Sequence, residues 1–154
     1  MLFRSRISCF PVTIPAAIPY EEAEVLGYFK LDFLHLSPLD YVSSKQEIRE
    51  LIHQEPDWSL LEDERVIVRL FQISKHAELI KLLHPTSIQE LADSIALIRP
   101  GKKHLIPAYL RNKDGIRPEL YKRVSSGYYF KKSHAISYAL TIVLQLHLIA
   151  AGKL

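Results

Sequence analysis

The spacing of apolar residues divides the chain into a short β-like beginning and a longer helical remainder. Residues 1–20 are interrupted by prolines, and we expect one short strand over residues 7–14. Residues 26–36 hold a dense run of aromatic and aliphatic side chains that begins at Gly27, which favours a second strand. After Pro38 the apolar residues recur at helical intervals instead. The pattern therefore places the β structure in front of the helices.

Four segments after Pro38 are predicted to be helices. One has Thr86 as its cap, with Gln89 at the capping-box position, and it ends at Arg99-Pro100-Gly101. Between the helices, alternation at Val66, Val68 and Leu70 favours a short strand. The four helical segments cover residues 39–53, 77–83, 86–99 and 133–151, and the polar stretch 102–132 is expected to be a loop with short helical turns.

The last predicted helix carries no formally charged residue, so it needs to be compared with a membrane span. A span takes about 20 predominantly apolar residues. The segment 133–151 falls just short of that, and polar side chains such as Thr141 and Gln145 interrupt it. We therefore expect a helix buried in the protein or docked on a partner, and no membrane.

Taken together, these elements predict an α+β fold that is predominantly α-helical, with a small β element near the N-terminus. The chain has 154 residues, of which 48% are hydrophobic, enough for one domain with its own core. We expect a β segment over 1–37 and a helical region over 38–154, packed as one compact unit. Cys9 is a single cysteine, which excludes a disulfide framework. No apolar run follows Arg4 and Arg6 before Pro11, so no signal peptide is expected and the cytoplasm is the default location.

The charges are sorted along the chain. Residues 21–64 hold twelve acidic and three basic side chains, whereas residues 99–132 hold ten basic and two acidic ones. A basic block of this size suits a polyanion such as nucleic acid, and tyrosines at 109, 121 and 128 add rings that can stack on unpaired bases. The alternative is a solvated lysine-rich face with no ligand. Charge alone does not decide between the two.

Catalytic motifs of the common kinds are absent from the sequence. The seven histidines show no metal-ligand spacing, and there is no phosphate-binding glycine loop and no nucleophilic serine motif. One pair is notable, because Lys30 and Asp32 share a face of the predicted strand in an apolar context. Burying either charge alone is costly. The pair is either a structural salt bridge or a metal-binding carboxylate with a cation beside it for phosphate.

Four segments, in order along the chain, resemble motifs of the bacterial DNA polymerase III alpha subunit, the C family of DNA polymerases. Residues 27–36 are similar to its late palm motif G-hydrophobic-K-x-D-F-L-G-L, with His35 in place of the second glycine. The others are similar to the motifs F-Q-x-E-S, A-L-x-R-P-G and G-F-N-K-S-H-S-x-x-Y-A-L. They lie at residues 70–73, 95–101 and 129–140.

The resemblance implies a late-palm-like β segment followed by a helical fingers-like region that faces template and incoming nucleotide. It implies that Asp32 is the catalytic, metal-binding carboxylate and that Lys30 neutralises phosphate. The cofactor would be Mg²⁺, and DNA would be the partner. The residues expected at nucleotide or DNA are Arg99, Lys102, Lys103, Arg111, Lys131, Lys132, Ser133 and His134.

The departures from the family pattern are as informative as the matches. The family's other two metal-binding aspartates form a D-x-D motif, and these 154 residues contain none. Only Lys102 to Lys131 stand where the family has well over a hundred residues, which removes its paired triphosphate-binding arginines. Two-metal phosphoryl transfer needs at least two carboxylates. We therefore do not expect polymerase activity from the chain alone.

Three hypotheses follow. In the first, the chain is a reduced or split polymerase of phage-like type that binds primer–template DNA and completes its site with a second chain carrying the missing aspartates. In the second, it is a non-catalytic replisome accessory or decoy that mimics polymerase fingers. In the third, it is a remnant that folds without a function. In each of them Phe71, Leu97 and Leu140 are expected in the core; Ser133 has a simpler alternative role as a helix cap, and Arg99 as a cation near a helix end.

Overall fold

The computed structural model describes residues 22, 25–27, 36–122 and 130–154. The chain divides into two units, residues 1–35 and residues 36–154. The described residues of the first unit form a turn, in which the Leu26 backbone N–H donates to the Glu22 carbonyl oxygen at 3.2 Å and Gly27 takes a φ of 82°. The strand predicted over 7–14 and residues 28–35 of the second strand lie outside the described residues. The palm-like character of segment 1–37 stays a prediction.

The second unit is built from helices of two kinds, α-helices and short 3-10 helices. In chain order its elements are η1 (Ser37–Tyr41), α2 (Lys45–His53), η2 (Trp58–Glu62), α3 (Glu64–Ile67), α4 (Ala77–Leu83), α5 (Ile88–Leu97), η3 (Pro100–Leu105), α6 (Ile106–Arg111), α7 (Lys113–Leu120) and α8 (Lys132–Ala150). The predicted helix 77–83 has the same bounds as α4, and the predicted helix 133–151 differs from α8 by one residue at each end. The expected loop 102–132 holds most of η3 and all of α6 and α7.

The predicted α+β class, with its small β element, is wrong for the part of the chain that the structure describes, where no β-strand occurs. The strand expected at Val66, Val68 and Leu70 is replaced by α3 and the turns that follow. The Asp63 side chain caps this helix by accepting a hydrogen bond from the Arg65 backbone N–H at 2.9 Å. Ile67 and Leu70 are both buried, and their separation fits one face of a helical turn. Capping and burial therefore override the local alternation.

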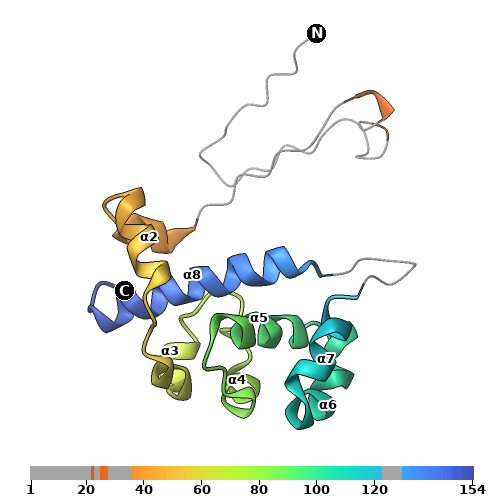
Figure 1. Cartoon of the computed structure of the whole chain (residues 1–154). Coiled ribbons are helices and arrows are strands. Elements are labelled where there is room, and N and C mark those ends of the chain that lie inside the picture. The colour runs from red at the N-terminus through yellow and green to blue at the C-terminus, as the bar shows by residue number, and fades with distance from the viewer. Residues whose placement is uncertain (1–21, 23–24, 28–35, 123–129) are drawn as a thin grey trace. The chain divides into compact units, whose positions relative to one another are not determined.

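The core of the helical unit lies between α5 and α8. Figure 1 shows α8 extending across the unit, with α5 beside it and α4 below. Every residue of α5 from Leu91 to Leu97 is buried, and so is the α8 stretch from Ile142 to Leu146. Leu97 is core as predicted, whereas Phe71 and Leu140 are partly buried at the core's edge. Burying an apolar side chain of this size contributes about 1.5–3 kcal/mol, so this helix pair is a main source of stability.

α8 is the one helix in the described residues that is long and apolar enough to cross a membrane. Its 19 residues include an 18-residue window with a mean hydropathy of 1.4, and 44% of that window is buried inside the protein. Its apolar side chains pack on α5 and α2. This is the arrangement expected for the core helix that the sequence predicts.

The start of α5 lies one residue later than the sequence predicts. The cap is Ser87 rather than Thr86, and the Ser87 hydroxyl accepts from the Glu90 backbone N–H at 3.2 Å. Glu90 replaces Gln89 in the reciprocal role, since its carboxylate accepts from the Thr86 backbone N–H at 3.0 Å. The sequence contains two overlapping capping boxes, Thr86 with Gln89 and Ser87 with Glu90, and the helix uses the second.

A buried carboxylate connects α5 to α6 and α7. Asp93 is 0% exposed and accepts hydrogen bonds from the Tyr109 and Tyr121 hydroxyls, each at 3.0 Å. The Arg117 Nε donates to it at 2.7 Å, and Gln89 donates to it from the same helix at 2.9 Å. Both carboxylate oxygens are therefore satisfied, as a buried charge requires. We call Asp93 with these four partners the Asp93 hub.

Candidate nucleic-acid interface

Arg99 lies just past the end of α5, where it joins two distant segments of the chain. Its Nη2 donates to the Gln72 Oε1 at 2.9 Å, and its guanidinium carbon lies 4.5 Å from the centroid of the Phe130 ring. This geometry is a cation–π contact. The Arg99 Nε is buried without a hydrogen-bond partner in the structure. Arg99 therefore does more than compensate the dipole at a helix end.

The backbone at Gln72 has an unusual conformation for a residue that is not glycine. Its φ is 64°, in the left-handed region that L-residues rarely adopt. The neighbouring backbone is held by Gln145 of α8, whose Oε1 accepts from the Phe71 N–H at 2.8 Å and whose Nε2 donates to the Arg69 carbonyl at 3.3 Å. Gln145 is 5% exposed. The core helix thus fixes the turn that presents Gln72 to Arg99.

Aromatic rings surround the other side of Arg99. Phe130 stacks on Tyr138 with ring centroids 6.1 Å apart, and Phe71 meets Tyr138 edge-on at 5.4 Å. His134 lies 6.4 Å from both Phe130 and Tyr138. We call Phe71, Gln72, Arg99, Phe130, His134 and Tyr138 the Arg99 cluster. Three motifs that are far apart in the sequence meet in it, namely those at 70–73, 95–101 and 129–140.

Four predicted DNA contacts lie together at the start of α8. Lys131, Lys132, Ser133 and His134 are all exposed. Lys132 lies over the Tyr121 ring, with its Nζ 5.9 Å from the centroid. The simpler alternative for Ser133, that it caps the helix, is wrong, because α8 begins at Lys132 and Lys131 is the N-cap residue. Two lysines and an imidazole at an exposed helix start can contact phosphate.

The three remaining predicted DNA contacts are Lys102, Lys103 and Arg111, and they differ in whether the charged group already has a partner within the protein. Lys102 donates from its Nζ to the Glu119 carbonyl oxygen at 2.6 Å, so it links η3 to α7. Lys103 is exposed on η3. Arg111 is exposed at the last residue of α6. Lys103 and Arg111 form no salt bridge within the described ranges 36–122 and 130–154, so a ligand can pair with both charges.

The predicted catalytic pair, Lys30 and Asp32, lies outside the described residues. Within the part of the chain that the structure describes, no three histidine, cysteine, aspartate or glutamate side chains come together as a metal site. Mg²⁺ therefore stays a prediction that depends on Asp32 and on carboxylates from elsewhere.

Sequence reasoning missed the residues that hold the cluster in place. Gln145 stands between Leu144 and Leu146, and Asp93 follows Leu91 and Ala92, so each lies beside core positions of its helix, where a polar group needs a buried partner. That signal is present in the sequence. It marks a structural role, but it does not identify the partners, which for Gln145 lie outside α8 and for Asp93 lie outside α5 except for Gln89.

Comparison with known proteins supports the resemblance seen in the motifs. Over 147 residues the chain is 24% identical to an error-prone DNA polymerase of Teredinibacter turnerae, a match that covers 86% of this chain and 14% of that protein. Over 115 residues it is 30% identical to a DNA polymerase III subunit alpha of Aquifex aeolicus, covering 65% of this chain and 10% of that protein. In this part of its length the chain is similar to DNA polymerase III alpha sequences. No protein-family model and no solved structure matches it.

The chain spans 14% and 10% of the lengths of these two polymerases. The similarity therefore concerns a fragment of a polymerase III alpha sequence, and the activity of the whole relatives does not transfer with it.

Proposed function

We propose that this chain binds primer–template DNA as a reduced or split polymerase III alpha-like protein in the cytoplasm. The observation that carries the proposal is the meeting of three polymerase-like motifs at the Arg99 cluster, next to the exposed basic start of α8. Apolar packing alone does not require Arg99, Gln72 and two lysines to lie close together. A site that contacts a phosphate backbone requires such a grouping of polar and basic side chains.

In this proposal each group at the site has a separate task. Lys131 and Lys132 neutralise phosphates, which supplies affinity without reading sequence. Arg99 is partly exposed, and its place on Phe130 limits the directions in which the guanidinium can point. His134 contacts DNA from the first turn of α8. Lys103 and Arg111 extend the basic surface along η3 and α6.

The catalytic part of the proposal rests on Lys30 and Asp32. Asp32 would supply one metal-binding carboxylate, and a second chain would supply the others. When bound, Mg²⁺ stabilises the charge that develops during phosphoryl transfer. Lys30 would hold a phosphate beside the carboxylate. Without the added carboxylates the chain binds DNA but does not extend a primer.

Fluorescence anisotropy with labelled primer–template DNA, measured across a salt series with and without Mg²⁺, tests the proposal. We expect the logarithm of affinity to fall linearly with the logarithm of salt concentration. The double variant Lys131→Ala/Lys132→Ala should reduce the magnitude of that slope by about 2, because each lysine accounts for roughly one released counterion. Lys45→Ala, an exposed lysine on α2, serves as the matched control. Absence of binding at low salt overturns the proposal.

Arg99→Lys tests the cluster rather than the charge. It keeps the cation but loses the planar fork that contacts Gln72 and covers Phe130. We expect affinity for primer–template DNA to fall about tenfold, the effect of losing one charge-assisted hydrogen bond. An unchanged affinity would show that the cluster is structural and that DNA, if bound, lies elsewhere.

A non-catalytic accessory or decoy is the second candidate, favoured by the absence of a D-x-D motif from these 154 residues. The accessory would bind DNA or other replisome proteins, and where both candidates bind DNA they differ at Asp32. A magnesium-dependent gain in affinity that is lost in Asp32→Asn supports the split polymerase. Binding that depends on residues 102–132 and ignores both Mg²⁺ and Asp32→Asn supports the accessory.

A further inference from the structure

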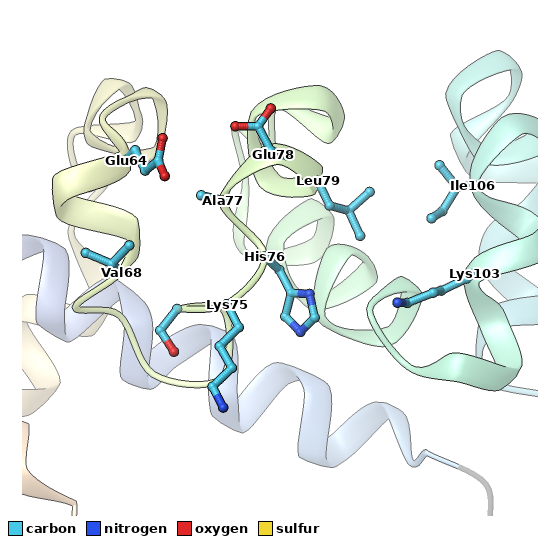
Figure 2. Close-up of a pocket in the computed structure, with 10 residues that line it drawn as sticks. Glu64, Val68, Lys75, His76, Ala77, Glu78, Leu79, Lys103 and Ile106 are labelled. Atoms are coloured by element: carbon cyan, nitrogen blue, oxygen red, sulfur yellow. The ribbon is translucent and has the colours of Figure 1, made fainter.

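A pocket of about 560 Å³ opens beside the segment 74–76. Figure 2 shows it between α3 and α4, with η3 and the start of α6 on the far side. Val68, Leu79 and Ile106 supply apolar lining, while Lys75, His76 and Lys103 supply nitrogen groups. The volume lies in the range of small-molecule sites, which combine apolar walls with a few polar groups.

The charges that line this pocket are unevenly balanced. Glu64 and Glu78 also line it, but Lys81 pairs with both, at 3.3 Å and 3.8 Å. In contrast, the ammonium groups of Lys75 and Lys103 form no salt bridge within residues 36–122 and 130–154. Figure 2 shows Lys75 and Lys103 on either side of the His76 ring, away from the two glutamates. One end of the pocket therefore carries positive charge that no carboxylate of the described residues compensates.

The pKa of His76 is sensitive to this positive charge. Partial burial lowers its pKa first, and the nearby charges of Lys103, Arg99 and Lys75 lower it further. The imidazole is therefore neutral at pH 7, and a bound anion would raise its pKa again. Three cations act on His76: Lys75 from its own segment, Arg99 from the end of α5 and Lys103 from η3. The carboxylates that line the same pocket are Glu64 and Glu78.

We propose that this pocket binds a phosphate monoester attached to an apolar body the size of a nucleoside. The phosphate contacts Lys75, His76 and Lys103, and the apolar body packs against Leu79 and Ile106. Two sources share this chemistry, a free mononucleotide and the 5′-phosphate end of a DNA strand. The inference goes beyond the proposed function, since a phosphate monoester can occupy the pocket whether or not the start of α8 binds duplex DNA.

NMR titration of the whole chain with dAMP tests the proposal, followed through the ring resonances of His76. We expect saturable shifts and a rise in the His76 pKa on binding. Deoxyadenosine and inorganic phosphate should each bind at least about tenfold more weakly, since each lacks half of the contacts. No saturable shift of His76 with dAMP overturns the proposal. Inorganic phosphate that binds as tightly as dAMP overturns the part played by the apolar wall.

Variants separate this pocket from the DNA surface. Lys75→Ala should weaken dAMP about tenfold, and Val68→Asp should weaken it by adding a negative charge at an exposed position of the wall. Lys45→Ala removes the same charge from α2 and should change nothing. The variant Lys131→Ala/Lys132→Ala should retain dAMP binding even where it loses DNA. Equal dAMP affinity in Lys75→Ala and the unaltered chain contradicts the assignment.

Oligonucleotides distinguish the two sources. If the source is a strand end, a 5′-phosphorylated strand should shift the His76 resonances more strongly than its unphosphorylated twin. If the source is a free nucleotide, the two strands should behave alike while dAMP binds. Both results support a phosphate-monoester site, whereas a strand and dAMP that both leave His76 unshifted exclude it.

Discussion

Asp93 and Arg99 come from the same stretch of chain, one inside α5 and the other just past its end, and both lie among aromatic side chains. Asp93 is fully buried, and its carboxylate accepts four hydrogen bonds. Arg99 is partly exposed, makes one hydrogen bond to Gln72 and keeps a buried Nε without a partner. The protein therefore supplies the Asp93 carboxylate with a full set of hydrogen-bond donors, whereas the Arg99 guanidinium has only one acceptor among the described residues.

This difference separates a structural charge from a candidate ligand site. A closed network leaves a ligand nothing to add, and removing its centre exposes every partner at once. Arg99, by contrast, is partly exposed and donates to one protein group, so its guanidinium keeps the capacity for a further partner. The Asp93 hub holds α6 and α7 against α5, and so it positions the basic residues of those elements. The Arg99 cluster is where a ligand would gain contacts.

Removing the Asp93 carboxylate should give the largest effect on stability. Asp93→Ala leaves the Arg117 Nε and two tyrosine hydroxyls without their acceptor, while Asp114 still accepts from the Arg117 Nη1. An unsatisfied buried donor costs about 1–3 kcal/mol, so losing three acceptor contacts at once should cost about 3 kcal/mol or more. Urea unfolding measures the loss. Asp114→Ala is the matched control, because it removes an 89% exposed carboxylate from the same arginine and should cost less than about 1 kcal/mol. Equal losses in both variants would contradict the closed-network interpretation.

Alkaline pH should open the same hub without a mutation. Burial raises the pKa of Tyr109 and of Tyr121 above the ordinary value of 10.0, and the negative charge of Asp93 raises both further. The folded state therefore holds these two protons more tightly than the unfolded state. Their contribution to stability is complete below pH 10 and is lost as the pH rises through the folded values. Urea midpoints measured across this range should fall, and Tyr121→Phe should flatten the fall; an unaltered slope would contradict the hub.

How far the sequence predicts the molecule can be seen in its helices. The bounds of α4 and nearly those of α8 follow from apolar spacing and from the stop signal at Pro85. The strand expected at Val66, Val68 and Leu70 failed because alternation over so few residues is weak beside a good cap at Asp63 and burial at helical spacing. Local patterns thus predict long elements better than short ones.

The sequence proposes members for the candidate site, but it does not predict how they are arranged. The polymerase-like motifs by themselves predict that Arg99 and the start of α8 contact a ligand. They do not show that Gln72 adopts a left-handed backbone or that Gln145 fixes the turn beside it, because both contacts join segments far apart in the sequence. The predicted roles of Lys30 and Asp32 stay predictions, since neither residue is among those described.

Gln145 links the buried core to the open cluster, so its removal should affect both. Gln145→Leu leaves the Phe71 N–H and the Arg69 carbonyl without their partner, which costs about 2 kcal/mol. The free energy of unfolding measures this, and affinity for primer–template DNA should fall as the turn loosens. Ser137→Ala removes an exposed hydroxyl of the same helix and should change stability by less than about 0.5 kcal/mol. If Gln145→Leu is less stable but keeps its affinity for DNA, then Gln145 does not couple the core to the Arg99 cluster.

The smallest effect concerns the backbone at Gln72, and a pair of variants isolates it. Gln72→Ala and Gln72→Gly both lose the bond to Arg99, so both should weaken DNA binding equally. Glycine adopts a φ of 64° without a steric penalty, and its larger unfolded-state entropy offsets part of that gain. Gln72→Gly should therefore be more stable than Gln72→Ala by on the order of 0.5 to 1 kcal/mol.

His84 provides the control for this pair. It has a φ of 44° at the end of α4, outside the Arg99 cluster. His84→Gly should likewise be more stable than His84→Ala, but neither should change DNA affinity. If the His84 pair weakens DNA binding as much as the Gln72 pair, then backbone conformation anywhere in the unit affects the site. The special role of the turn at Gln72 would then be lost, since it rests on the hydrogen bond to Arg99 and not on the left-handed backbone alone.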